Sequence, residues 1–166
     1  MSTILAIDPG NTHSGYAFIN EDTRQPLEVG KVPNDDILDL LGDYHGPVVI
    51  EMVASYGMAV GREVFETCVW IGRFQEAHAQ VVGCLPELVY RRDVKLHHCN
   101  SAKAKDANIT QALIDRFASG EPNRGKGTKT NPGWFHGFAG DMWQAYALAV
   151  YVADTMSDMP HLVRTN

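Results

Sequence analysis

The sequence lacks several features that would assign it to a membrane or secreted class. No apolar run approaches the roughly 20 residues that a membrane-spanning helix needs. The start of the chain has no basic segment of the kind that opens a secretory signal. Its cysteines (Cys68, Cys84 and Cys99) are odd in number and form no CxxC pair, which argues against a disulfide framework and a zinc site. We therefore expect a cytosolic protein with reduced thiols.

Internal repeats and inter-domain linkers are also missing. A chain of 166 residues with 45% hydrophobic content is long enough to bury a sizeable core, so the sequence predicts one domain over residues 1–166. A positive net charge is absent as well. The formal net charge of −6 argues against a nucleic-acid partner for the chain as a whole. Between residues 91 and 129, however, nine Lys or Arg face four Asp or Glu, so a local basic zone interrupts the acidic chain.

Hydrophobic patterning predicts an α/β fold with a mixed sheet flanked by helices. Three strands at the start would form an antiparallel meander, and strands then alternate with helices. The polar, Gly- and Lys-rich segment 121–132 is expected to be a mobile loop. The expected strands are 4–7, 15–19, 26–32, 48–50 and 88–90, and the expected helices are 35–41, 61–82, 103–117 and 140–156.

Three acidic residues stand at ends of elements whose patterns predict burial. Asp8 follows the first apolar strand, Glu51 follows the strand 48–50, and Asp141 opens the last helix. Buried carboxylates need a positive partner, and Mg²⁺ with oxygen ligands is a common one. Two such ions about 4 Å apart would clamp the attacking and leaving oxygens of a phosphodiester. The alternative is that each acid is a turn or helix-capping residue.

Four segments resemble the RuvC-type Holliday junction resolvases, in the family's order and over nearly the whole chain. They are AIDPGNTHSGYAFI, VVIEMV, VKLHHCNSAKAKDANITQALIDRF and DMWQAYALAVY, and their forms are most similar to the phage-encoded branch. The resemblance implies an RNase H-like fold, a homodimer, and Mg²⁺- or Mn²⁺-dependent hydrolysis of branched DNA in a bacterial or phage-infected cell. It also implies a four-acid site, with Asp8, Glu51 and Asp141 as metal ligands.

The fourth acid of the family is missing from this sequence. The last helix of the family carries two acids three residues apart, followed by Ala-Leu-Ala. Aligning this chain on Ala-Leu-Ala places Asp141 at the first acid and Gln144 at the second. Gln144 would then be a neutral oxygen ligand among the catalytic residues. His136 lies nearby in the sequence and is the other candidate for a further ligand or base.

The resemblance also suggests which residues bind DNA. Lys95 and Lys105 take the places of two lysines beside the metal site, where Lys105 would stabilise charge on the attacked phosphate and Lys103 could fill the same role. Tyr56 stands in the loop where the family has an aromatic residue that stacks on unpaired bases. The alternative for the lysines is a solvated helix face. Three basic residues of the polar loop would suit the backbone phosphates of DNA if the loop is an extended arm: Arg124, Lys126 and Lys129. The alternative is that this segment is a plain disordered loop.

The long helix carries an apolar stripe with two interpretations. By resemblance its residues would form the dimer interface, but an intramolecular core explains the same pattern equally well. The stripe consists of Phe65, Cys68, Ile71 and Phe74.

Two other functions remain open from the sequence. The segment IDPGNT also resembles the first phosphate loop of sugar-kinase and actin-like ATPases, although these need a second, duplicated domain that 166 residues do not hold. The other alternative is a catalytically inactive protein that binds branched DNA. The three acids argue against it, and Gln144 argues for it.

Overall fold

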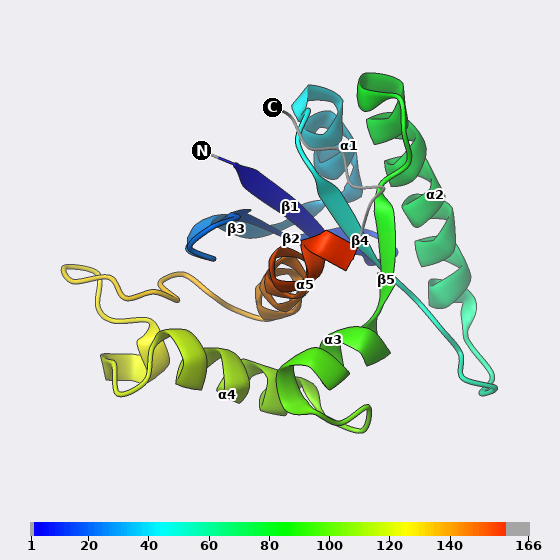
Figure 1. The fold of residues 1–166 in the computed structure, drawn as a ribbon. Coiled ribbons are helices and arrows are strands. Elements are labelled where there is room, and N and C mark those ends of the chain that lie inside the picture. The colour runs from blue at the N-terminus through cyan, green and yellow to red at the C-terminus, as the bar shows by residue number, and fades with distance from the viewer. Residues whose placement is uncertain (1, 159–166) are drawn as a thin grey trace.

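A computed structural model describes residues 2–158 and shows a five-stranded mixed sheet with helices on both faces (Figure 1). The strand order is β3-β2-β1-β4-β5; β1, β2 and β3 are antiparallel, whereas β1, β4 and β5 are parallel. This confirms the predicted α/β class with a mixed sheet. The strands are β1 (Thr3–Asp8), β2 (His13–Asn20), β3 (Pro26–Pro33), β4 (Val48–Met52) and β5 (Glu87–Tyr90).

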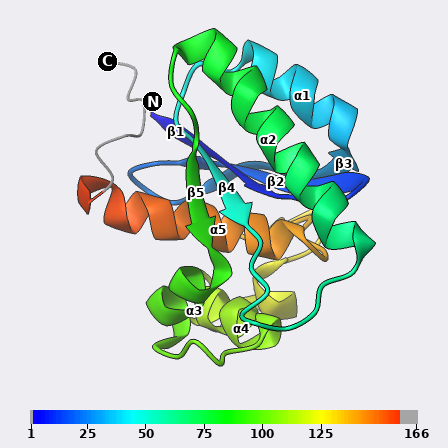
Figure 2. The same ribbon diagram turned by 90° about the vertical axis from the view of Figure 1, so that its right-hand side faces the viewer.

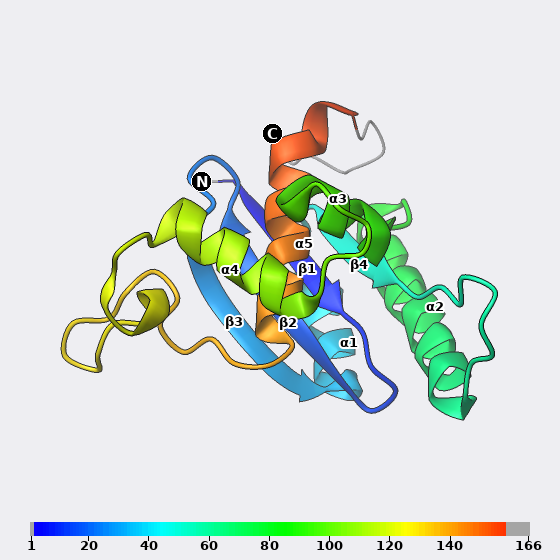
Figure 3. The same cartoon turned by 90° about the horizontal axis from the view of Figure 1, so that it is seen from below.

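The helices form two layers. Helices α1 (Asn34–Asp43) and α2 (Arg62–Val82) cover one face of the sheet, and α5 (Met142–Thr155) covers the other (Figure 2). Helices α3 (Arg91–Cys99) and α4 (Asp106–Phe117) pack across the outer side of α5 (Figure 3). Two short 3-10 helices, η1 (Pro122–Gly125) and η2 (Met156–Asp158), complete the described chain.

The sequence explains why β1 and α5 lie at the centre. All four residues from Ile4 to Ile7 are fully buried, because β1 has a strand on each side and helices on each face. Helix α5 is apolar around its whole circumference, and its small Ala145, Ala147 and Ala149 let it pack closely between the sheet and α3–α4. None of the helices in residues 2–158 is both long and apolar enough to cross a membrane.

Several predicted boundaries are wrong. The basic segment 91–95 is the start of helix α3, which the sequence pattern missed because Val94 is its one buried residue. Helix α4 begins at Asp106 rather than Lys103. Segment 121–132, expected as a loop, contains η1 and an isolated bridge between Gly127 and Pro132. This segment is therefore folded on itself and does not form an extended arm.

Candidate active site

Strand pairing brings the first two acids together. Ile7 of β1 is in register with Ile50 of β4, and both side chains belong to the core facing α1 and α2. The next residues, Asp8 and Glu51, therefore lie side by side on the opposite face, toward α5. Glu51 is 9% exposed, so its carboxylate is largely withdrawn from solvent.

A glycine brings the third acid to the same place. Gly15 of β2 pairs with Asp8, and a Cβ at Gly15 would lie 3.0 Å from both the Cβ and the carbonyl oxygen of Asp141. Asp141, the residue before α5, can therefore pack directly over β2 only because position 15 has no side chain. Lys31 of β3 is the next residue across the sheet from Gly15, and its Nζ lies 2.5 Å from Asp141 Oδ2. Asp141 thus sits between the Asp8–Glu51 pair and an exposed lysine.

The electrostatics of Asp8 reflect this crowding. Burial, followed by the negative charges of Glu51 and Asp141, raises the pKa of Asp8 well above its ordinary value, although Arg91 acts in the opposite direction. No hydrogen bond or ion pair to the Asp8 carboxylate is present in the part of the chain that the structure describes. The site therefore holds more negative charge than its own side chains neutralise.

Glu51 does have a cationic partner. Arg91 Nη1 donates to both carboxylate oxygens of Glu51, at 3.0 and 3.2 Å, and Nη2 donates to Asp106. Burial raises the pKa of Glu51, whereas Arg91 and the more distant Lys95 lower it. Arg91 thus joins Glu51 to Asp106 at the start of α4, and Asp106 becomes a fourth carboxylate near the cluster.

The donor set fits a hard divalent cation. Carboxylate oxygens and the Gln144 amide are the ligand types that Mg²⁺ and Mn²⁺ prefer. The repulsion at Asp8 is also the condition that such a cation relieves. Within residues 2–158, no group of three His, Cys, Asp or Glu side chains has the arrangement of a metal site. The donors are present, but Glu51 is occupied by Arg91.

Gln144 lies one helical turn after Asp141. Its backbone N–H donates to the Asp141 carbonyl at 3.1 Å, and its side chain is 8% exposed. No described residue hydrogen-bonds to its side-chain amide. Although the residue is largely buried, its amide atoms are not sealed from solvent. Its position one turn after Asp141 agrees with the predicted place of a fourth ligand, which stays a prediction.

The predicted DNA-binding residues fall into separate groups. Tyr56, which is 63% exposed, and Lys95 line a cavity of about 310 Å³ together with Arg91, Arg92 and Ala102. This cavity borders Glu51 through Arg91.

Lys103 and Lys105 lie before α4 and are exposed to solvent. Lys105 is the N-cap residue of α4, and its N–H donates to Asn108 Oδ1 at 2.8 Å. No described acid forms an ion pair with either lysine.

The basic residues of segment 121–132 follow α4 in the chain, and two of them lie beside its first two turns, near Ala107 and Thr110. Arg124 and Lys126 line a cavity of about 320 Å³ beside Trp143, and Arg124 Nη2 donates to Gln111 at 3.3 Å. Lys129 is exposed. Since the segment is folded, these residues belong to a compact surface.

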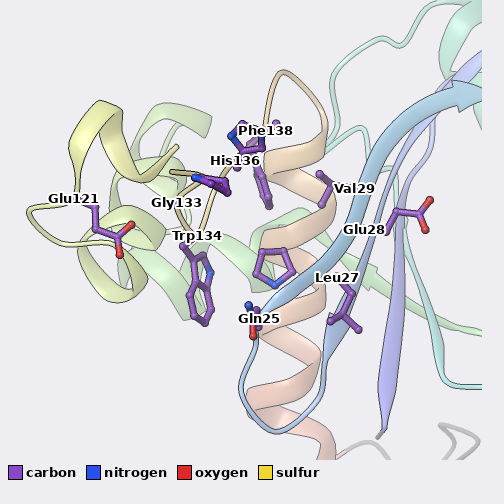
Figure 4. A pocket seen from close by; sticks show the side chains of 12 residues that line it. Gln25, Leu27, Glu28, Val29, Glu121, Gly133, Trp134, His136 and Phe138 are labelled. Atoms are coloured by element: carbon purple, nitrogen blue, oxygen red, sulfur yellow. The ribbon is translucent and has the colours of Figure 1, made fainter. Parts of the chain in front are cut away.

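His136 lies away from the acids. Its Nδ1 is 3.3 Å from the Lys126 carbonyl, and the ring lines a cavity of about 550 Å³ between β3 and the 121–138 segment (Figure 4). Trp134 and Phe138 share the wall of this cavity. No contact joins His136 to Asp8, Glu51 or Asp141 among the described residues, so the structure does not support it as a ligand.

Four residues of the site were not assigned from the sequence: Gly15, Lys31, Arg91 and Asp106. Gly15 lies within the quoted motif, and its pairing follows from the short hairpin between the first two strands. The β2–β3 register would likewise have placed Lys31. Arg91 and Asp106 meet because the connection between α3 and α4 returns the chain from the end of α3 to its start, and no local pattern predicts that.

This sheet order, with a central helix over the C-terminal ends of β1 and β4, is the RNase H-like fold of the RuvC type. The structure of Thermus thermophilus RuvC matches with a TM-score of 0.68 and 14% identity, over 96% of this chain and 98% of that chain. A second structure, T. thermophilus RuvC in complex with Holliday junction substrate, matches with a TM-score of 0.67 and 15% identity over 98% of both chains. The sequence itself matches no family model and no curated protein. The predicted resemblance is confirmed at the level of the fold.

Proposed function

We propose that the protein is a metal-dependent, structure-specific endonuclease that nicks four-way (Holliday) junctions and other branched DNA by phosphodiester hydrolysis. The observation that carries the proposal is the placement of Asp8, Glu51 and Asp141 at neighbouring positions of β1, β4 and the start of α5, where burial and the other two acids raise the pKa of Asp8. The RuvC-type fold around this cluster supports the same activity. We infer that residues 1–166 act as a single nuclease domain in the cytosol of a bacterial or phage-infected cell.

We infer that Mg²⁺, for which Mn²⁺ would substitute, binds at the cluster with two ions per site. Asp8, Glu51 and Asp141 would hold the ions, and Gln144 would add a neutral oxygen. Bound ions of this kind supply charge stabilisation at the attacked phosphate and a more acidic water. The chain itself orients these donors through the rigid ends of β1 and β4 and through the close packing of Asp141 on Gly15.

The basic residues would position the DNA around the cluster. Lys95 and Tyr56, which share a cavity next to Glu51, are suited to a phosphate and to an unpaired base respectively. Lys105, or Lys103 beside it, would approach the attacked phosphate from the start of α4. The outer phosphates would contact Arg124, Lys126 and Lys129.

We propose a homodimer that uses the exposed side of α2. Phe65 and Val69, four residues apart, are 62% and 64% exposed, and an apolar surface of this kind is typical of an interface. Ile71 and Phe74 are buried in the core against the sheet, so these two residues of the predicted stripe are intramolecular. Cys68, the remaining residue of the stripe, is partly buried.

The two other functions make different demands. An ATPase of the sugar-kinase type needs a second phosphate-loop domain, whereas residues 2–158 form one sheet with its covering helices. An inactive DNA-binding protein has no need for three carboxylates held together at a cost in charge repulsion. Both observations favour the nuclease.

The test is cleavage of an end-labelled four-way junction with Mg²⁺ and with EDTA, beside a linear duplex of the same sequence and an ATP hydrolysis assay. We expect paired nicks in the junction only, in the presence of Mg²⁺ and without ATP turnover. ATP hydrolysis, or tight junction binding with no cleavage in Mg²⁺ or Mn²⁺, would contradict the proposal.

A further inference from the structure

Arg91 occupies an unusual position, because it binds the carboxylate that the proposed metal would need. It follows β5, whose residues Val89 and Tyr90 are in register with Glu51 and Met52 of β4. The guanidinium therefore emerges directly beside Glu51, and Nη1 contacts both carboxylate oxygens at 3.0 and 3.2 Å.

The burial of the pair shows that Glu51 depends on this contact. The side chain of Glu51 is 11% exposed and that of Arg91 is 25% exposed. A buried carboxylate is costly unless a cation and hydrogen bonds compensate it. Among the described residues, Arg91 is the cation that forms an ion pair with Glu51, and Lys95 acts from farther away.

The other end of the guanidinium has a second partner. Nη2 donates to Asp106, whose side chain is 65% exposed at the start of α4. Because this contact lies toward solvent and does not involve Glu51, Arg91 can lose one carboxylate and stay paired with the other.

We propose that Arg91 is an internal counter-ion for Glu51, and that its guanidinium would leave Glu51 but stay paired with Asp106 when the carboxylate cluster holds a divalent cation. A divalent ion held by Glu51 would lie close to the Arg91 guanidinium, and in this partly buried site the repulsion between the two cations would weaken the Arg91–Glu51 contact. The divalent ion would also relieve the repulsion at Asp8. Arg91 is thus a positioning residue. It stabilises the Glu51 carboxylate when no metal is bound, and it competes with the metal for that carboxylate. This inference rests on the metal site of the proposed function.

The competition can be measured without DNA, from the apparent Mg²⁺ dissociation constant (the Mg²⁺ midpoint below) that is fitted to the rise of Tm with Mg²⁺ concentration. In Arg91→Gln we expect a lower Tm in EDTA and a Mg²⁺ midpoint about tenfold below that of the wild type, since a charged hydrogen-bonded competitor is lost. Arg92→Gln is the matched control. It removes the same charge from the next residue, whose side chain is exposed. Its midpoint should stay near the wild-type value.

The possible outcomes separate the two proposals. In one outcome, the wild-type Tm responds to Mg²⁺, Asp8→Asn loses the response, and Arg91→Gln has the same Mg²⁺ midpoint as the wild type. This outcome would overturn the role of Arg91 and leave the metal site standing. A wild-type Tm that ignores Mg²⁺, together with no junction cleavage, would overturn both. If Arg91→Gln is unfolded in EDTA, Arg91→Lys decides. Its ammonium keeps the charge but lacks the planar fork of the guanidinium, so it holds Glu51 less firmly and its Mg²⁺ midpoint should fall below that of the wild type. An unchanged midpoint would contradict the competition.

Discussion

Single residues decide how closely the acids approach one another. Asp8 and Glu51 are neighbours through strand register, but Asp141 comes from a distant helix and reaches them by packing on Gly15. Lys31 and Arg91 then neutralise the two outer acids, which leaves Asp8 without a cationic contact. The charge of the cluster is therefore concentrated on its central member.

Gly15→Ala tests the contact between β2 and Asp141. The new Cβ would lie about as close as 3.0 Å to Asp141, so the acid or the start of α5 has to move. We expect cleavage to fall at least about tenfold, with a loss of about 1–3 kcal/mol in the free energy of unfolding from overpacking. Junction cleavage and urea unfolding measure the two effects. Gly42→Ala on α1, where a Cβ meets nothing within 4 Å, is the control and should keep full activity.

Gln144 tests whether the fourth ligand place is used. The residue is 8% exposed, lies one turn after Asp141, and has no hydrogen bond from a described residue to its side-chain amide. Gln144→Glu should lower the Mg²⁺ concentration for half-maximal cleavage, because a carboxylate adds charge to the donor set, and Gln144→Ala should raise it. Junction binding should change little in either variant. Identical Mg²⁺ midpoints in the three proteins, with altered stability alone, would make Gln144 a purely structural residue.

At the scale of elements, apolar periodicity was the reliable signal. It predicted β1, β4, α2 and α5 within a few residues, because each buries a continuous apolar face. It failed for α3, whose surface is polar apart from Val94 and whose position depends on contacts with α4 and α5. Arg91 was therefore not predicted as a site residue, whereas Asp8, Glu51 and Asp141 were predicted from their places at element ends.

One ion-pair cluster holds the end of α5 to its surroundings. Asp154 accepts from Arg24 beyond β2, from His97 of α3 and from Arg116 of α4, and its side chain is 13% exposed. Burial opposes its charge, but the hydrogen bonds from Arg116, His97 and Arg24 together lower the pKa of Asp154 below its ordinary value. The cluster therefore connects α5 to three other parts of the chain.

Asp154→Asn should lower the free energy of unfolding by about 2 kcal/mol or more, because three donors lose a charged acceptor. A depressed folded-state pKa stabilises the protein fully above the unfolded value of about 3.9, and this contribution is lost as the pH falls toward the folded value. The wild type should therefore lose stability more steeply than Asp154→Asn below about pH 4. Denaturant unfolding at neutral and acid pH measures both effects. Parallel pH profiles would contradict the role of the cluster.

At the scale of the whole molecule, the basic zone and the exposed apolar residues of α2 lie on different sides of the sheet. The basic residues between 91 and 129 gather on α3, α4 and the following segment, on one side of the carboxylate cluster. The exposed apolar residues of α2 lie on the other face of the sheet. This arrangement leaves the proposed DNA surface and the proposed dimer surface free of each other.

Phe65→Asp with Val69→Asp should convert the proposed dimer to a monomer. Both side chains are exposed, so the substitutions should leave the fold intact, and two related active sites would no longer act on one junction. Light scattering gives the mass, and paired nicking should become single nicking. Leu27→Asp, which changes an exposed apolar residue on β3, is the control and should stay dimeric. A monomeric wild type, both free and on junction DNA, would contradict the dimer.

The most direct test of the central claim is Asp8→Asn, assayed for both junction binding and junction cleavage in Mg²⁺. Asn removes the charge at the centre of the cluster and keeps the shape of the side chain, so the account predicts junction binding as tight as or tighter than the wild type. It predicts that cleavage falls below detection, while the wild type nicks the same junction in Mg²⁺ and not in EDTA. Near-normal cleavage by Asp8→Asn would contradict the assignment of this cluster as the active site.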